Sequence, residues 1–462
     1  MNIDLRISGV MYESLKTHLF PGDDKESVAI ALCGVHRSSD NSTKILVHKL
    51  IPIPIEDCII RTDVQVNWRT QKLIDVLELA ARKKFSLLKI HSHPTGFAEF
   101  SQTDDNSDNE LFDSVFAWIE DVDIHVSAVM LPDGRIFGRA ITRQEELRFE
   151  PLNKITVAGS DIRYFIDHNL DVDSFNIRTA QAFGDATTSL LKNLTVGIVG
   201  CSGTGSPTIE QVARLGFGKI VMIDPDKIEL KNLNRILNST RVDAENERHK
   251  VEVLKKAVLS MGLGTQVDAL SANLYDGHTG IHKIVECDVL FGCMDSVDGR
   301  HLLNQIATFY LIPYFDLGVK LLADGRGGIE QIWATVHYLQ PGKSSLLTRG
   351  VYTLEDLNAA SLYRKDPVTY EALKKEGYIK NVNVESPAVI SINMQISSIA
   401  LIEFLARVHK FRYDDNADSA VTRVSLSDSY IQKEPDGETD IYLEKFVGRG
   451  DMVPLLNMPE FS

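Results

Sequence analysis

The fold class of this chain follows from LTVGIVGCSGTGS, residues 194–206. The stretch begins as a short apolar run, turns through closely spaced glycines and passes into SPTIEQVARLG, which has the composition of a helix. A second apolar run, KIVMIDP, follows directly. This order of strand, glycine-rich turn, helix and strand predicts a mostly parallel sheet with helices on its faces. We therefore expect a doubly wound α/β domain from about residue 176 onward.

The glycine-rich turn predicts a phosphate-binding site of Rossmann type. Gly200 permits the tight turn, and Gly205 permits close packing where the helix starts. Ser202 occupies the middle glycine position of the G-x-G-x-x-G pattern, and Gly203 beside it supplies the backbone freedom. Unpaired N–H groups at the helix N-terminus attract phosphate. Asp224 ends the next strand, where a carboxylate binds ribose hydroxyls.

The residues beyond Asp224 distinguish a dinucleotide from ATP. IDPDKIELKNLNR contains Asn232 and Arg235, Lys250 lies on the next predicted helix, and FGCMDSVDGR contains Asp295. An oxidoreductase has no need of Arg235 and Lys250, which argues against an NAD-dependent dehydrogenase. A carboxylate that attacks the α-phosphate of ATP builds negative charge, which such cations stabilise.

This combination resembles the ThiF/ubiquitin-activating-enzyme family of adenylyltransferases, over about residues 176–410. The resemblance implies that Asn232, Arg235 and Lys250 bind the phosphates of ATP. It also implies that Asp295 binds Mg²⁺ and the region of the incoming carboxylate. Arg178 precedes the first strand, where the family often has an arginine that reaches the active site of the other subunit. The resemblance therefore also implies a homodimer.

A second motif, KIHSHPTGFAEFSQTDD at residues 89–105, predicts a metal site. His91 and His93 point to the same face of an extended segment, because side chains alternate along a strand. Asp104 completes a three-ligand set and leaves the fourth position of a tetrahedral zinc ion for water. Ser101 lies where its hydroxyl could stabilise the oxyanion formed when water attacks a carbonyl.

The spacing H-S-H-P-x6-S-x2-D resembles the signature of the JAMM (MPN+) metalloproteases, over roughly residues 1–145. These zinc isopeptidases cut ubiquitin and ubiquitin-like proteins from their conjugates. The resemblance implies an MPN-like α/β fold for the first part of the chain. That family uses a glutamate on an early strand as general base, and Glu26, just ahead of VAIALCG, is the matching residue here.

Three regions are therefore expected along the chain. Residues 1–150 form a JAB/MPN metalloprotease domain, residues 151–175 form a linker, and residues 176–462 form the adenylation domain. Within the first region, the polar run SQTDDNSDNE (101–110) reads as a loop. VDIHVSAVMLPDGRIFGRAI (122–141) predicts a hairpin with Asp-Gly at its turn.

The charge and the cysteine content indicate which partners and which cellular compartment to expect. The net charge is −15, from 64 acidic and 49 basic residues, which argues against binding to nucleic acid or to an anionic membrane. Five cysteines without a C-x-x-C pair indicate a reducing compartment, and we expect a cytoplasmic protein. The start of the chain shows no signal peptide, and polar residues interrupt the most apolar segment, Ala388 to Ala406.

One feature departs from the activating-enzyme pattern. Family members usually carry a cysteine that takes the adenylated C-terminus as a thioester, but no cysteine follows Cys293. QPGKSSLLTRG has Ser344 and Ser345 where related chains often have a cysteine. One hypothesis is that the chain only adenylates and hands the acyl-adenylate to a partner or amine. The other is that one of the two serines takes an oxyester.

Taken together, the two motifs predict a bifunctional enzyme, of bacterial type, that acts on a ubiquitin-like protein. The first domain would trim or deconjugate that protein, and the second would adenylate its C-terminal carboxylate, with Zn²⁺, ATP and Mg²⁺ as cofactors. Its partners would be a ubiquitin-like protein with a Gly-Gly-type tail and a conjugating-enzyme-like protein. The alternatives are a sulfur-carrier protein or a small peptide as substrate, or a protease with an inactive activating domain.

Overall fold

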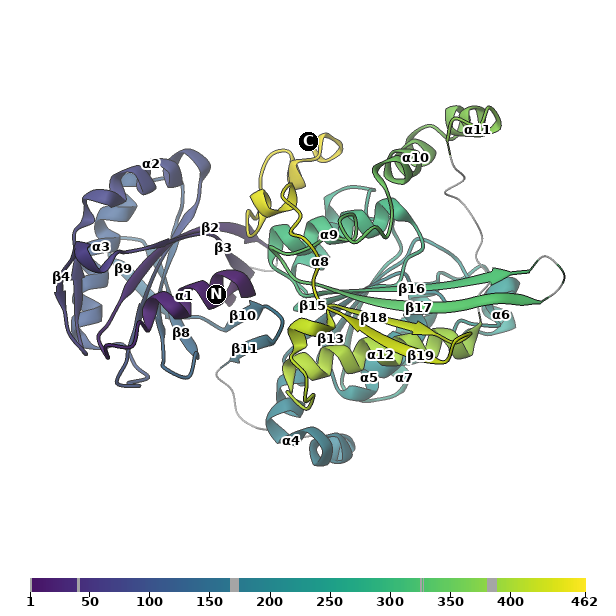
Figure 1. Ribbon diagram of the computed structural model, residues 1–462, viewed down its shortest axis with the longest axis horizontal. Helices are drawn as coiled ribbons and strands as arrows, with labels where there is room; N and C mark the ends of the chain where they lie inside the picture. The colour runs from purple at the N-terminus through teal and green to yellow at the C-terminus, as the bar shows by residue number, and fades with distance from the viewer. Residues whose placement is uncertain (1, 40–41, 167–173, 325, 327, 380–388) are drawn as a thin grey trace. The chain divides into compact units, whose positions relative to one another are not determined.

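The computed structural model divides into two compact units, and each is built around its own sheet (Figure 1). The first unit consists of Met1–His168, Phe309–Leu311 and Lys445–Ser462. The second consists of Asn169–Thr308 and Ile312–Glu444. The structure describes residues 2–39, 42–166, 174–324, 326, 328–379 and 389–462.

The sheet of the first unit has nine strands in the order β11-β10-β1-β3-β2-β6-β7-β8-β9. Parallel and antiparallel pairs are mixed: β1 is parallel to β3 and β10, whereas β2 is antiparallel to β3 and β6. A separate hairpin joins β4 (Cys58–Arg61) to β5 (Val66–Trp68). The nine strands are β1 (Asn2–Ser8), β2 (Val28–Arg37), β3 (Ser42–Pro52), β6 (Ser86–Ser92), β7 (Ile124–Met130), β8 (Ile136–Arg143), β9 (Leu147–Pro151), β10 (Lys154–Ala158) and β11 (Ile162–Ile166).

Helices cover both faces of this sheet. Helix α1 (Gly9–Leu19) packs on one face, and α2 (Leu73–Lys83) and α3 (Gln102–Trp118) pack on the other. Strand β2 serves both cores, because its odd-numbered Ala29 and Ala31 face α1 while the alternate side chains face α2 and α3. The predicted hairpin at 122–141 is confirmed as β7 and β8.

Helix α3 corrects one expectation. The polar run 101–110 reads as a loop in the sequence, but the helix begins at Gln102 and includes most of that run. Ser101 and Asp104 form a capping box, in which each side chain bonds the backbone N–H of the other. The apolar side chains that anchor the helix, Phe112 and Phe116, come only in its second half. Local composition therefore concealed the helix start.

The expected linker also contains regular structure. Residues 154–158 and 162–166 form β10 and β11, which extend the first sheet beyond β1. Strand β10 pairs with β1 in parallel, with Asp4 opposite Lys154. This pairing joins segments about 150 residues apart, so periodicity within 151–175 could not reveal it.

The second unit has an eight-stranded sheet in the order β14-β13-β12-β15-β16-β17-β18-β19. The first five strands in this order, from β14 through β12 to β16, pair in parallel. Strands β17, β18 and β19 continue the sheet in antiparallel pairs. The order reverses at β12, as in a Rossmann-type fold, and this confirms the predicted α/β class. The strands are β12 (Thr195–Val199), β13 (Lys219–Ile223), β14 (Gln266–Leu270), β15 (Val289–Gly292), β16 (Tyr314–Ala323), β17 (Ile329–Leu339), β18 (Val421–Ser425) and β19 (Tyr430–Glu434).

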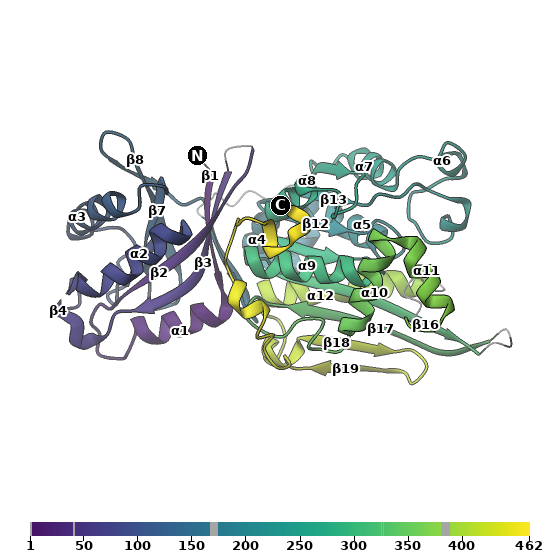
Figure 2. The same ribbon diagram turned by 90° about the horizontal axis from the view of Figure 1, so that it is seen from above.

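Figures 1 and 2 show α5, α7 and α12 on one side of this sheet and α8 and α9 on the other. Phe404 of α12 packs against Phe217, Phe291 and Phe315, which fixes the helix on the sheet. In the described part of the chain, no helix combines the length and apolar character needed to cross a bilayer. The helices are α4 (Ile177–Lys192), α5 (Gly205–Leu215), α6 (Arg241–Glu245), α7 (Lys250–Ser260), α8 (His278–Val285), α9 (Val297–Tyr310), α10 (Leu354–Lys365), α11 (Pro367–Lys375) and α12 (Ile390–Val408).

The segment Lys445–Ser462 belongs to the first unit and crosses strands β2 and β3. Gly448 has a φ of +64°, and a Cβ at this position would lie 2.2 Å from the carbonyl oxygen of Val47. Asp451 accepts a hydrogen bond from the hydroxyl of Tyr310 at 2.7 Å and lies 3.0 Å from Nδ1 of His36. Backbone contact and buried polar bonds therefore hold this segment in place.

Candidate metal centre and candidate nucleotide site

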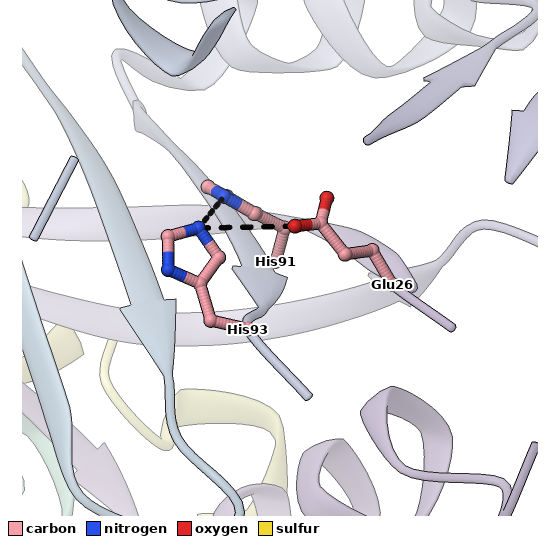
Figure 3. Close-up of side chains that lie close together, drawn as sticks. All are labelled: Glu26, His91 and His93. Carbon is pink, nitrogen blue, oxygen red and sulfur yellow. Dashed lines mark hydrogen bonds and ion pairs between the residues drawn. The ribbon is translucent and has the colours of Figure 1, made fainter. Parts of the chain in front are cut away.

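Three of the predicted residues of the metal site meet at one end of strands β2 and β6. Val28 pairs with His91 in the antiparallel register, which brings Glu26 alongside His93. The Nε2 atoms of His91 and His93 are 3.1 Å apart, and His93 Nε2 is 3.9 Å from Glu26 Oε1 (Figure 3). All three side chains are buried and point toward one another.

Asp104 reaches the same point from the first turn of α3. Its Oδ1 lies 2.9 Å from His91 Nε2, and its Oδ2 lies 3.5 Å from His93 Nε2. The capping box fixes this carboxylate, because the Ser101 N–H and hydroxyl both donate to Asp104 Oδ2 at 2.7 Å. Ser101 thus lies at the site, but its hydroxyl is bonded to Asp104 and not directed at open space.

Burial gives the two carboxylates opposite proton affinities. Burial raises the pKa of Glu26 to about 7, and the nearby His93 only partly offsets the shift. Burial also opposes the charged form of Asp104, but hydrogen bonds from His91 and His93 outweigh it and hold the pKa of Asp104 well below its usual range. Burial lowers the pKa of His91, which favours the neutral imidazole that metals bind.

The arrangement fits one zinc ion. Zinc holds nitrogen and oxygen ligands at about 2.0–2.2 Å, so neighbouring ligands of a tetrahedral site lie about 3.3 Å apart. The separations among His91, His93 and Asp104 are 2.9, 3.1 and 3.5 Å. His93 Nδ1 lies 2.7 Å from the carbonyl oxygen of Phe97, which orients its ring so that Nε2 faces the other ligands.

A buried ion-pair network holds α3 against the sheet behind these ligands. Lys89, two residues before His91 on the same face of β6, donates to Asp108 at 2.7 Å. Arg139 donates to the other oxygen of Asp108 at 2.7 Å and to Asp105 at 2.5 Å. Asp104 therefore sits at the start of a helix that two cations anchor one turn further along.

In the second unit, the glycine-rich turn packs as tightly as its sequence predicts. Gly200 has a φ of +90°, and a Cβ there would lie 2.5 Å from the carbonyl oxygen of Cys293. A Cβ on Gly205 would lie 1.9 Å from the carbonyl oxygen of Gly200. Helix α5 starts at Gly205 without a side-chain cap. The N–H groups of Ser206 and Thr208 bond the carbonyl oxygens of Ser202 and Thr204, and Pro207 has no N–H, so backbone donors for a ligand come from the turn ahead of the helix.

Asp224 and Lys250 come together beside this turn. Asp224 is 5% exposed, and its two oxygens accept the N–H groups of Cys201 at 2.7 Å and Asp226 at 2.9 Å. Lys250 Nζ donates to Asp226 at 2.6 Å and lies 3.7 Å from Asp224. Burial raises the pKa of Asp224 although Lys250 lowers it. A buried lysine and carboxylate thus flank the turn.

The other residues predicted for the nucleotide site range from buried to exposed. Asn232 is buried and caps its own turn by accepting the N–H of Glu229 at 3.0 Å. Arg235 bonds the carbonyl oxygen of Lys231 at 2.8 Å, and its Cδ lies beside Gly203. Asp295 is exposed in the loop after β15, and Arg178 is exposed on α4, where it donates to Gln181.

The candidate acyl acceptors of the second unit are all inaccessible. Cys201 and Cys287 are fully buried, and Cys293 is 7% exposed. Ser344 and Ser345 are each 2% exposed and donate to Asp436 and Asp440, respectively. The two serines therefore anchor their own loop, and their placement does not favour the oxyester hypothesis.

Sequence reasoning missed the residues that support these sites. The carbonyl of Phe97 orients His93 through the backbone, for which no side-chain motif exists. Asp226 pairs with Lys250. The sequence places Asp226 two residues after Asp224, but the pattern predicted no role for it. Asp108 holds α3 in place, but the run that contains it reads as a loop.

Comparisons with known proteins concern the second unit. A family model described as the ThiF family matches residues 175–397. The Drosophila ananassae protein named adenylyltransferase and sulfurtransferase MOCS3 is 33% identical over 137 residues, which is 29% of this chain and 29% of that protein. Ubiquitin-like modifier-activating enzyme 5 from Caenorhabditis briggsae is 24% identical over 165 residues, 34% of this chain and 36% of that protein. The chain thus spans about a third of the length of these relatives.

Among solved structures, E. coli MccB with ATP aligns with a TM-score of 0.43 and 18% identity, over 60% of this chain and 76% of MccB. The family match covers the turn after β12, Asp224, Lys250 and the loop after β15. Residues 175–397 are therefore the part of this chain that is similar to the ThiF family.

Proposed function

We propose that the second unit is an ATP-dependent adenylyltransferase that activates a protein or peptide carboxylate. The observation that carries this proposal is the buried pair of Lys250 and Asp224 beside the uncapped start of α5, within the ThiF-family segment. Such a site offers a cation and the N–H groups of the glycine-rich turn to a polyphosphate, and a carboxylate to a ribose. MOCS3, a relative of this segment, is named an adenylyltransferase.

In this proposal each residue acts on charge or position. Asp224 accepts ribose hydroxyls, and Lys250 moves from its ion pair with Asp226 to the phosphates. Arg235 and Asn232 supply further donors. The incoming carboxylate attacks the α-phosphorus, the bond to the bridging oxygen breaks, and pyrophosphate leaves. Asp295, exposed at the carboxyl edge of β15, would hold Mg²⁺ with the phosphates.

We propose a zinc-dependent peptidase as the function of the first unit. The convergence of His91, His93 and Asp104 within 3.5 Å, with Glu26 beside them, favours it. A bound zinc ion would supply Lewis-acid activation of water. Glu26, which burial gives a pKa of about 7, accepts the proton of that water and passes it to the leaving amine. Ser101 would stabilise the oxyanion after its hydroxyl turns from Asp104.

The two activities suit one substrate class, a ubiquitin-like protein with a Gly-Gly-type tail. The first unit would trim or release this tail, and the second would activate it. One relative of the second unit is named for activation of a ubiquitin-like modifier and another for sulfur transfer, so a sulfur-carrier protein is the second candidate. A homodimer in which Arg178 reaches the partner site, and a conjugating-enzyme-like acceptor, complete the proposal.

The test mixes the full chain with Mg²⁺-ATP and a small protein ending in Gly-Gly, and intact masses are then measured. An added AMP on the small protein is the expected result, together with exchange of labelled pyrophosphate into ATP. The Lys250→Ala variant serves as the matched negative control. A wild-type chain that neither transfers AMP nor exchanges pyrophosphate would contradict the adenylyltransferase.

The peptidase is tested separately, because the two sites do not share residues. The same small protein with a C-terminal extension is incubated with the zinc-loaded chain, and cleavage after the Gly-Gly is expected. His93→Ala abolishes this cleavage and leaves AMP transfer unchanged. Zinc-loaded wild-type protein that leaves every such extension intact would speak against the peptidase alone.

A further inference from the structure

A buried amide in the first turns of α12 points at the glycine-rich turn. Asn393 is 3% exposed, and its Nδ2 has no hydrogen-bond partner among the residues that the structure describes. A Cβ built on Gly203 would lie 2.3 Å from this Nδ2, so the amide lies directly against the turn. Buried donors are nearly always bonded, so this unpaired donor needs an acceptor from outside the protein, such as a ligand oxygen.

Two further features of this corner attract an anion. Helix α12 is 19 residues long, and neither a side-chain cap nor an acidic residue occurs in its first turn. No side chain of the helix itself therefore compensates the positive potential of its N-terminus, as far as the described residues show. Arg235 approaches from the opposite element, with its Cδ 3.4 Å from the same Cβ position of Gly203. An amide donor, a helix N-terminus and a guanidinium-bearing side chain thus converge.

The position of Asn393 is fixed and not adaptable. One turn further along α12, Ser397 Oγ lies 2.8 Å from the carbonyl oxygen of Thr204, which ties the helix to the turn. Phe404 packs among the aromatic side chains of the sheet. The helix is therefore held at both places, which keeps the Asn393 backbone beside the turn.

We propose that Asn393 is a phosphate-binding residue whose Nδ2 donates to an oxygen of the β- or γ-phosphate of ATP. This inference rests on the proposed adenylyltransferase function. The terminal phosphates carry more negative charge than the α-phosphate, and they suit a corner where Arg235 and a helix N-terminus meet. Gly203 is then required because a side chain there would collide with the amide.

The test compares nucleotide affinities of the full chain by isothermal titration calorimetry, with Mg²⁺-ATP and AMP as probes. Asn393→Leu keeps the branched shape of the side chain and removes the donor, and Asn393→Asp removes the donor and introduces a charge that repels phosphate. We expect the Kd for ATP to rise about tenfold or more for Leu, and further for Asp, with the Kd for AMP unchanged. Met394→Ala, one residue along and 43% exposed, is the matched control and keeps wild-type affinities.

The outcomes distinguish failure of the adenylyltransferase from failure of the Asn393 assignment. Wild-type protein that binds no ATP overturns the adenylyltransferase and this inference together. Wild-type ATP affinity in both Asn393 variants overturns this inference alone, and so does an equal loss of ATP and AMP affinity, which would mean that Asn393 only shapes the turn. Weaker binding of the carboxylate substrate at unchanged ATP affinity would assign Asn393 to that substrate and also overturn it. If Asn393→Leu fails to fold, Asn393→Ala, which adds no bulk, is measured instead.

Discussion

At the candidate metal centre, Glu26 and Asp104 are both carboxylates, yet their surroundings shift their pKa values in opposite directions. Asp104 accepts bonds from two imidazoles and from the N-cap of its helix, and these keep it ionised as a ligand. Glu26 has only a distant partner, His93 at 3.9 Å, so burial dominates and its pKa lies at about 7. A group with that pKa can both accept and release a proton near neutral pH.

Glu26→Gln separates proton transfer from metal binding. The amide cannot accept a proton but keeps the shape of the side chain, so we expect peptidase kcat to fall by about 10²–10⁴. Zinc content should stay at the wild-type level, because Glu26 is not among the three closest ligands. Asp104→Asn is the matched comparison, and it should lower zinc affinity as well as activity. Metal analysis of both purified variants checks this, and zinc loss in Glu26→Gln would make Glu26 a ligand.

Motif spacing could predict that His91, His93 and Asp104 lie together, because their placement is local. Alternation along β6 puts His91 and His93 on one face, and a helix cap spans the three residues between Ser101 and Asp104. The sequence could not predict Asn393, because its proximity to Gly203 depends on packing between elements nearly 190 residues apart. Long-range contact, not residue type, limits prediction at this scale.

Among the elements, helix α5 begins at a position where the backbone leaves no room for a Cβ atom. Gly205→Ala would place a Cβ 1.9 Å from the carbonyl oxygen of Gly200, which is backbone and cannot move aside. We expect a loss of about 1–3 kcal/mol in the free energy of unfolding, together with loss of ATP binding. Gly437→Ala is the control, because its nearest neighbour would be Ser344 Cβ at an ordinary 3.6 Å. Thermal melts and ATP titrations measure both variants, and a fully stable Gly205→Ala would contradict the packing described.

Strand β7 carries an acid-sensitive histidine. His125 packs against Phe112 and Phe116, accepts the N–H of Leu87 on Nδ1, and burial lowers its pKa to about 3. The unfolded chain, with a pKa of about 6.5, therefore binds a proton that the folded chain does not. Stability is lost as pH falls from about 6.5 toward 3, by up to about 1.4 kcal/mol per pH unit.

His125→Gln keeps an acceptor for Leu87 and removes the titration. We expect the first unit to lose less stability between pH 6.5 and 4 than the wild type does, with about one proton fewer taken up on unfolding. Denaturant unfolding across this range provides the measurement. His337 in β17, whose pKa burial also lowers to about 3, remains as an internal reference in the second unit. An unchanged pH slope in the variant would mean that His125 does not titrate in this way.

Strands could be predicted from the sequence where an apolar run had the length of a strand. They were missed where the partner strand lies far away in the sequence. Strands β12, β13 and β15 are buried apolar runs, and their place in a mostly parallel sheet could be expected from the chain alone. Strands β10 and β11 are as short, but β10 joins the sheet through β1, which lies at the other end of the first unit's sequence, and β11 joins it through β10. Helix α3 was missed because its first ten residues are nearly all polar.

At the scale of the whole molecule, the close approach of Gly448 to Val47 governs how Lys445–Ser462 joins the first unit. Gly448→Ala would collide with that carbonyl at 2.2 Å. We expect faster hydrogen exchange in β2 and β3 and faster proteolysis of this segment. Gly350→Ala is the control, because its φ of +67° is nearly the same but nothing lies within 4 Å. Equal exchange in the two variants would show that the contact carries no weight.

The return of Lys445–Ser462 to the first unit also sets the order in which the molecule can be made. A ribosome emits β1 to β11 first, yet Asp451, the acceptor for Tyr310, emerges only after the whole second sheet has been synthesised. The first unit therefore reaches its final packing last, although it is encoded first. The same topology means that a gene cut between the two sheets yields a first fragment without its closing segment. Engineers who wish to separate the two units need to carry codons 445–462 along with the front half.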